Sequence, residues 1–462
     1  MKFSSVASTA FLAASVHAGC DYVGGNYYCS ETNAVVYSNV GYSGHYSDVT
    51  SMDESTCKCS QSSVSFSGSL APLNEELSVH FRGPINLVQF GVYYPGDSVS
   101  FKKRDQVAED APCTTVSTAK KHHEHKREAA VQWVEVTSTI VVDADGNPVE
   151  TDAASGGSAT EVTDGTTILT PVFSPVTSSP ASAASSSSSS ASGSGSGSSS
   201  STSSTSSSSS SSSGSSSGSS SAWNRVSYFT PGSAQNLTFM NHQGGVKGSG
   251  TWSACFGNSI SYCDSDGVTG AASAVALDDV TLPSNKEFMI FSGSSCDDSS
   301  EGDCGYYRSD IPAYHGFGGA TKMFVFEFSM PNDNSGDYNV DMPAVWLLNA
   351  KIPRTLQYGD ESCSCWKTGC GELDLFEILS TGSDKLITHI HSGQGADGTS
   401  SGGGGTQDYF KRPTSGTLKA AVIFDGADQT IHIVEVDDSF GSTISADTVN
   451  SWFSKSGSSA AL

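Results

Sequence analysis

The chain from residue 223 to residue 462 is a succession of short apolar runs with the spacing of β-strands. Glycine- and aspartate-rich turns separate these runs, and no long stretch has the period of an amphipathic helix. The runs read VSYFT, KEFMIFSG, MFVFEFSM, AVWLL, LDLFEIL, LITHIH, LKAAVIF and TIHIVEV. This pattern predicts an all-β domain over residues 223–462.

A second group of candidate strands lies near the start of the chain. LSVHF and INLVQFGVYY are split by the turn-forming Arg82-Gly83-Pro84 and follow Cys20, Cys29, Cys57 and Cys59. We expect residues 19–100 to form a small β domain braced by two disulfides. The tyrosines of this domain either form an aromatic surface that binds sugar or pack at its rim; they are Tyr27, Tyr28, Tyr37, Tyr42 and Tyr46.

The segment between the two groups has a different composition. Residues 101–180 contain basic clusters ending at Arg104 and Arg127, which resemble kexin-type processing sites; a solvated basic loop is the alternative. Residues 181–222 are only Ser, Gly, Ala and Thr, which cannot form a core and predict a disordered linker between two modules.

The start of the chain resembles a secretory signal peptide. Residues 1–18 contain Lys2, a short apolar stretch and a small-residue cleavage site ending at Ala18. We therefore expect a secreted glycoprotein, with one N-glycosylation sequon at Asn236. A net charge of −25 argues against a nucleic-acid partner, and neither a membrane span nor a C-terminal lipid-anchor signal is encoded, so no membrane anchor is expected.

Because secreted proteins fold in an oxidising environment, we expect the twelve cysteines to form disulfides rather than to bind zinc. In the later domain we expect local bridges from Cys255 to Cys263 and from Cys296 to Cys304. The remaining cluster, Cys363, Cys365 and Cys370, is expected to brace a loop. Because the domain holds an odd number of cysteines, one thiol is either free or bonded to the other domain.

Three acidic residues interrupt the apolar run GELDLFEIL, and isolated charges are costly to bury. A retaining glycosidase needs a nucleophilic carboxylate and a carboxylic acid close together, and Glu372 and Glu377 are candidates for this pair. Strict alternation would place them on opposite faces of a strand. A β-bulge at Leu375 or Phe376 would bring both to one face, with Asp374 between them. The alternative is a strand edge with solvated acids.

At this point the sequence resembles a known family. ELDLFE, residues 372–377, resembles the E-x-D-x-x-E signature of laminarinase-like members of glycoside hydrolase family 16. With the flanking stretches at 315–331, 342–359 and 363–379, it resembles the C-terminal domain of the fungal Target-of-SBF cell-wall proteins. The resemblance implies a concanavalin-like jelly-roll β-sandwich and endo-β-1,3-glucanase activity without a cofactor. It also implies that Glu372 is the nucleophile, Asp374 its helper and Glu377 the acid/base.

Several residues near the acids are candidates for binding sugar. Trp366 and Trp346 are potential stacking platforms, although core packing is a strong alternative for Trp346. His389 and His391 share one strand face and either contact substrate or are structural. Arg354 and Tyr358 are candidates for hydrogen bonds to sugar hydroxyls.

We expect no metal site. The acidic cluster from Asp297 to Asp303 lacks a recognisable calcium-ligand spacing and is interpreted as a solvated loop. One departure from family 16 is that only residues 378–462 follow Glu377, so the C-terminal half of the domain is short.

Taken together, these features predict a secreted cell-wall protein that hydrolyses internal bonds of β-1,3-glucan with retention. Two alternatives remain open. The same covalent intermediate could pass to another sugar, which would make the protein a transglycosylase. The domain could also be a non-catalytic wall protein that binds glucan or has a structural role.

Overall fold

A computed structural model describes residues 19–96 and 222–462, except 245–248, 258–259, 299, 301, 336–339 and 396–401. The predicted signal peptide, the basic sites at Arg104 and Arg127, Cys113 and the linker at 181–221 lie outside the described residues. In the described part of the chain, no helix is long and apolar enough to cross a membrane.

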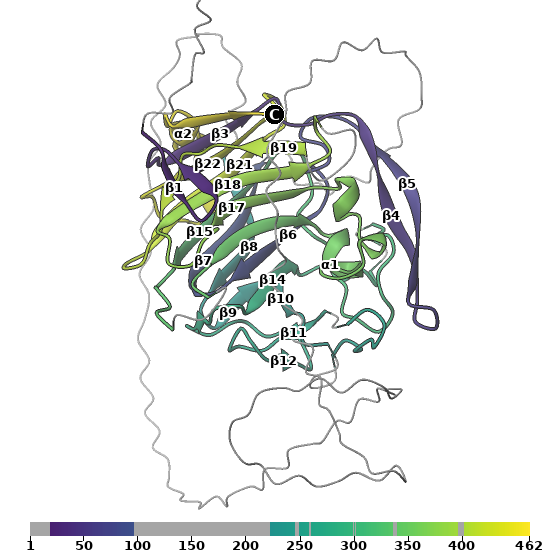
Figure 1. Ribbon diagram of the computed structural model, residues 1–462. Coiled ribbons are helices and arrows are strands. Elements are labelled where there is room, and N and C mark those ends of the chain that lie inside the picture. Colours follow the sequence, from purple (N-terminus) through teal and green to yellow (C-terminus); the bar gives the residue numbers. More distant parts are fainter. Residues whose placement is uncertain are drawn as a thin grey trace, which may run out of the picture. The chain divides into compact units, whose positions relative to one another are not determined.

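Two ten-stranded sheets make up most of the described structure (Figure 1). We call the first the β17 sheet; its strand order is β12 (Gly270–Ala271), β11 (Ser261–Cys263), β10 (Leu237–Asn241), β14 (Glu287–Ser292), β6 (Leu77–Arg82), β16 (Ala344–Asn349), β17 (Glu372–Glu377), β18 (Lys385–Ser392) and β19 (Gly402–Gly405), and β20 (Phe410–Lys411) also pairs with β18.

The second, which we call the β21 sheet, has the order β23 (Thr443–Ile444), β8 (Trp223–Thr230), β7 (Ile85–Pro95), β15 (Lys322–Ser329), β21 (Leu418–Asp425), β22 (Thr430–Glu435), β3 (Ala34–Ser38) and β24 (Ser458–Ala461), with β13 (Thr281–Leu282) on β7 and β9 (Ser233–Gln235) on β8. Two separate hairpins are β1 (Asp21–Val23) with β2 (Asn26–Tyr28), and β4 (Gly44–Asp53) with β5 (Lys58–Phe66).

The main hydrophobic core lies between the two sheets. Alternate residues of each central strand enter it, as the period of two requires. Phe81 of β6 and Phe326 of β15 meet across the interface with ring centroids 6.4 Å apart. The molecule is therefore a β-sandwich, and the prediction of an all-β fold is confirmed. The helices are short: α1 (Lys351–Thr355), α2 (Ala446–Phe453), η2 (Glu361–Cys363) and η3 (Trp366–Thr368).

The N-terminal strands belong to the same sandwich as the C-terminal strands, which corrects the expectation of a separate small domain at 19–100. β6 lies between β14 and β16 in the β17 sheet, and β7 lies between β8 and β15 in the β21 sheet (Figure 1). The physical reason is burial, because the first five residues of LSVHFR are all buried and need a neighbouring strand on each side.

The segment 97–221 is accordingly an insertion between two paired strands rather than a spacer between two modules. Pro95 of β7 pairs with Trp223 of β8, and the Gly96 N–H donates a 2.8 Å hydrogen bond to the Ala222 carbonyl. Both ends of the insertion therefore meet at one point of the sandwich.

Disulfides connect the two parts of the chain covalently. Cys57 bonds Cys255 and Cys59 bonds Cys363, which fastens the β4–β5 hairpin to the later part of the protein. The predicted bridge from Cys296 to Cys304 is confirmed, and Cys365 and Cys370 close the loop before β17. The predicted Cys255–Cys263 bridge is wrong, since Cys263 is a buried free thiol. Only one bridge, Cys20–Cys29, is internal to residues 19–100.

Candidate functional site

β17 contains the bulge that the spacing of its acids predicts. On β16, Trp346 pairs with Asp374, and Val345, the residue before Trp346, pairs with Phe376. Leu375 is therefore the extra residue of the bulge. Leu375 and Phe376 both lie in the core between the sheets. The strand therefore places two consecutive side chains inward and returns Glu377 to the outer face.

The outer face of the β17 sheet is thereby built from three cross-strand rows with one acid in each. Residues opposite each other on neighbouring strands have side chains in contact range. The rows, in the order β6, β16, β17 and β18, are Ser78, Leu348, Glu372 and His391; His80, Trp346, Asp374 and His389; and Arg82, Ala344, Glu377 and Ile387.

Glu372 and Asp374 are buried, and each has a nitrogen partner. The indole N–H of Trp366 donates a 2.7 Å hydrogen bond to Oε2 of Glu372. His391 Nε2 lies 3.2 Å from Oδ2 of Asp374, and its ring centroid is 4.4 Å from that of His389. The structure therefore brings Trp366, His389 and His391 to the acids, where the sequence had suggested them.

Glu377 is also buried, and its partner comes from the N-terminal segment. Arg82 Nη2 lies 3.3 Å from Oε1 of Glu377, and Arg82 Nε donates a 2.8 Å hydrogen bond to the Met342 carbonyl. Sequence reasoning missed Arg82, which it treated as a turn residue. The alternation of Ser78, His80 and Arg82 in LSVHFR predicts that these three side chains share one polar face of a strand. It does not predict which strand lies next to them.

Trp346 lies beneath Arg82 and beside His80. The guanidinium of Arg82 is 5.9 Å from the Trp346 ring, and the His80 ring stacks on it at 5.2 Å. Burial lowers the pKa of His80 well below its usual range, with a smaller contribution from His242, so His80 is neutral. Because Trp346 is only 5% exposed, it forms part of the floor of this face and offers little stacking surface.

Arg354 has a structural role instead of the expected contact with sugar. It is 2% exposed, and its guanidinium donates to Glu76 Oε2 at 2.5 Å and to the carbonyls of Cys304 and Tyr314. Burial opposes ionisation of Glu76, but the hydrogen bond from His315 and the charge of Arg354 bring its pKa down to about 2. The Arg354 donors are thus engaged inside the protein.

Tyr358 contacts Glu287, a neighbour of Arg82 in the β17 sheet. Its hydroxyl donates a 2.8 Å hydrogen bond to Oε2 of Glu287, and Glu287 pairs with Arg82 across β14 and β6. Burial and the Glu287 carboxylate raise the pKa of Tyr358 well above its usual range. Tyr358 is therefore a neutral donor to Glu287, the residue that pairs with Arg82.

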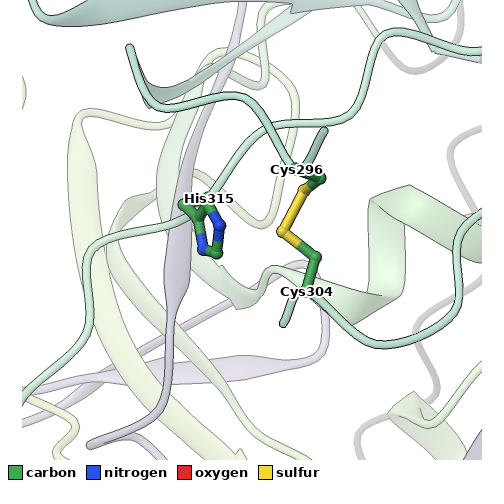
Figure 2. A group of neighbouring side chains, drawn as sticks. All are labelled: Cys296, Cys304 and His315. Carbon is green, nitrogen blue, oxygen red and sulfur yellow. A yellow bond between two sulfur atoms is a disulfide. The ribbon is translucent and has the colours of Figure 1, made fainter. Parts of the chain in front are cut away.

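One group of side chains in the described residues has the spacing of a metal site: Cys296, Cys304 and His315 (Figure 2). Its two sulfur atoms are bonded to each other, and His315 Nδ1 is 2.6 Å from Oε1 of Glu76. Disulfide sulfurs are not thiolate ligands, so this group does not fit a metal ion. In the neighbouring acidic cluster, Asp298 and Asp303 accept hydrogen bonds from their own turn, as a solvated loop would.

Two family models and several known proteins match this chain. Residues 221–452 match the family model "Cell wall protein YJL171C/Tos1, C-terminal", and residues 33–95 match the corresponding N-terminal model. The chain is 60% identical over 467 residues to "Probable circularly permuted 1,3-beta-glucanase TOS1" of Saccharomyces cerevisiae, which covers 100% of this chain and 97% of the relative.

More distant relatives also match over most of their length. The Candida albicans protein with the same name is 52% identical, with 100% of both chains covered. An Arthroderma benhamiae protein named "Probable circularly permuted 1,3-beta-glucanase" is 31% identical, with 95% of this chain and 92% of the relative covered. No solved structure matches the chain.

Proposed function

Because the chain belongs to the YJL171C/Tos1 family of cell wall proteins, we propose that it is a secreted enzyme that hydrolyses internal β-1,3-glucosidic bonds of wall glucan with retention. The observation that carries this proposal is the bulge in β17, which gathers Glu372, Asp374 and Glu377 on one face. The names of the relatives and the resemblance to family 16 support β-1,3-glucan as the substrate.

The proposed reaction is a double displacement. Glu372 attacks the anomeric carbon while Glu377 gives its proton to the departing glycosidic oxygen, which leaves a glycosyl ester on Glu372. Water then attacks the same carbon, passes a proton to Glu377 and releases Glu372. The Trp366 N–H fixes one oxygen of the nucleophile, and His391 holds Asp374 between the two working carboxylates.

We also propose that this chain, like the relatives named circularly permuted, has its strands in permuted order. Two observations support this. β3 and β24 lie side by side in parallel, so the first strand of the two large sheets is next to the last one. N-terminal strands also complete both sheets, which accounts for the few residues after Glu377.

The test is to incubate the full chain with laminarin and follow new reducing ends by proton NMR. We expect the β-anomer to appear first, because two displacements restore the configuration. An α-anomer at the earliest times would contradict retention. Products longer than an added oligosaccharide would instead indicate a transglycosylase, and glucan binding without any release of reducing sugar would indicate a non-catalytic wall protein.

Arg82 gives a further prediction for this reaction. In Arg82→Ala, Glu377 loses the side chain that orients Oε1, and we expect kcat on laminarin to fall about tenfold, the size of one charge-assisted hydrogen bond. Arg82→Lys should restore part of this loss. Arg225→Ala is the matched control, since Arg225 lies over Tyr228 in the β21 sheet and should leave kcat unchanged. An unchanged kcat in Arg82→Ala would contradict the role.

A further inference from the structure

The hairpin formed by β1 and β2 exposes apolar side chains to solvent. Within the described residues, five large hydrophobic side chains are strongly exposed, and three of them lie on this hairpin: Tyr22 at 64%, Val23 at 40% and Tyr27 at 50%. Single exposed apolar residues are ordinary, but such a cluster on one short element indicates a contact surface.

Tyr22 and Tyr27 form one continuous aromatic surface. They are direct cross-strand partners, so both side chains project from the same face of the hairpin. Their ring centroids are 4.8 Å apart with the planes tilted by 49°. Tyr28, the next residue, points to the opposite face and is buried.

A disulfide and a backbone hydrogen bond hold the hairpin in a fixed position on the protein. A two-stranded hairpin alone is marginally stable. Here the Cys20–Cys29 disulfide closes its base, and the Cys29 N–H donates to the Gln407 carbonyl at 2.8 Å. Gly24 and Gly25 form the two-residue turn with positive φ angles of 58° and 94°, which suit a tight hairpin.

The hairpin lies next to the proposed acid/base. A Cβ on Gly24 would be 1.9 Å from Oγ of Ser380, so the turn packs directly on the chain three residues after Glu377. On the buried side, burial raises the pKa of the Tyr28 phenol and the charge of Glu377 adds to the rise. Tyr22 is two residues from Gly24, roughly 7 Å along the strand.

We propose that Tyr22 and Tyr27 form an accessory platform that binds the β-glucan chain beyond the Glu377 end of the acidic row. The platform rests on the proposed function, because its occupant is the polymer that the acids cleave. Its chemistry fits a neutral sugar, since pyranose C–H faces pack on aromatic rings and tyrosine hydroxyls bond to sugar hydroxyls.

The proposed platform differs from the aromatic surface that the sequence left open as one of two alternatives. Three of the five tyrosines named there, Tyr28, Tyr37 and Tyr46, are buried. Tyr42 packs edge-on against Phe66 at 4.8 Å. Tyr27 alone is strongly exposed, and its partner is Tyr22.

The test compares long and short substrates. In the full chain carrying Tyr22→Ala and Tyr27→Ala, we expect binding to insoluble linear β-1,3-glucan to weaken about tenfold, the effect of losing two stacking rings. Binding is measured in an inactive Glu372→Gln background, so hydrolysis cannot remove the polymer. In the active background, KM for laminarin should rise while the rate on a short β-1,3-oligosaccharide stays unchanged.

Two variants serve as controls. Tyr22→Phe with Tyr27→Phe keeps both rings and should retain most of the binding, while Trp252→Ala removes another exposed aromatic ring and should not alter it. Unchanged glucan binding in the double alanine variant, or an equal loss in Trp252→Ala, would overturn the platform. Its failure is distinct from that of the proposed function, which is tested on the unaltered chain by the release of sugar from laminarin and by the anomer that forms first.

Discussion

A chain restricted to residues 223–462 is expected to be unfolded and inactive, although that segment contains every proposed catalytic acid. Removing the N-terminal part deletes β6 from the β17 sheet and β7 from the β21 sheet. Val79, Phe81 and Phe90 are completely buried, and each contributes about 2 kcal/mol. The whole stability of a folded domain is only about 5 to 15 kcal/mol. Far-UV circular dichroism and laminarin hydrolysis would measure the loss.

A full chain cut once within residues 181–222 should behave in the opposite way. The cut lies outside the strands that the structure describes, and the bridges Cys57–Cys255 and Cys59–Cys363 hold the two fragments together. We expect full activity, one band on a non-reducing gel and two bands after reduction. Processing at Arg104 or Arg127 would have the same outcome, a two-chain enzyme. Native circular dichroism from residues 223–462 alone, or separation of the cut fragments without reductant, would refute the shared sandwich.

Replacing Glu372 should have the largest effect on chemistry. In Glu372→Gln the volume and the contact with Trp366 can persist, but the amide cannot form the ester intermediate. We expect kcat on laminarin to fall by at least about a thousandfold, or roughly 4 kcal/mol in the barrier. Unfolding temperature should change little, which separates this effect from a folding defect.

The two acids can then be distinguished by adding azide. In Glu372→Ala, azide can attack the anomeric carbon directly, and this single displacement should give the α-glucosyl azide. In Glu377→Ala, azide should intercept the ester on Glu372 and give the β-glucosyl azide by a second displacement. The reverse pattern would exchange the two roles. Gln variants as active as the unaltered chain would reject the site altogether.

The shared face of Glu372, Asp374 and Glu377 could be predicted from residues that are close together in the sequence. Three acids in a buried run need one shared face, and their spacing allows that only with a bulge, which the structure has at Leu375. Arg82 could not be placed in the same way, because it pairs with Glu377 across 295 residues of chain. Alternation reveals the face of a strand but not which strand lies beside it.

The disulfides likewise could be predicted where the two cysteines are close in sequence and not where they are far apart. Cys296 and Cys304 are eight residues apart and bond as expected. The same reasoning failed for Cys255, whose partner Cys57 is 198 residues away on a hairpin that covers the later loops. Loop closure explains short bridges well, whereas a distant bridge follows only from the sheet order that brings its ends together.

The hydrogen bond between Gly96 and Ala222 makes the intervening segment the loop of a very long hairpin. For such a loop the entropy of closure grows with the logarithm of its length, so doubling it costs only about 0.6 kcal/mol. The free energy of folding of the sandwich therefore depends only weakly on the number of serines in this segment. The length of this segment can therefore vary among related chains while the acids on β17 keep their positions.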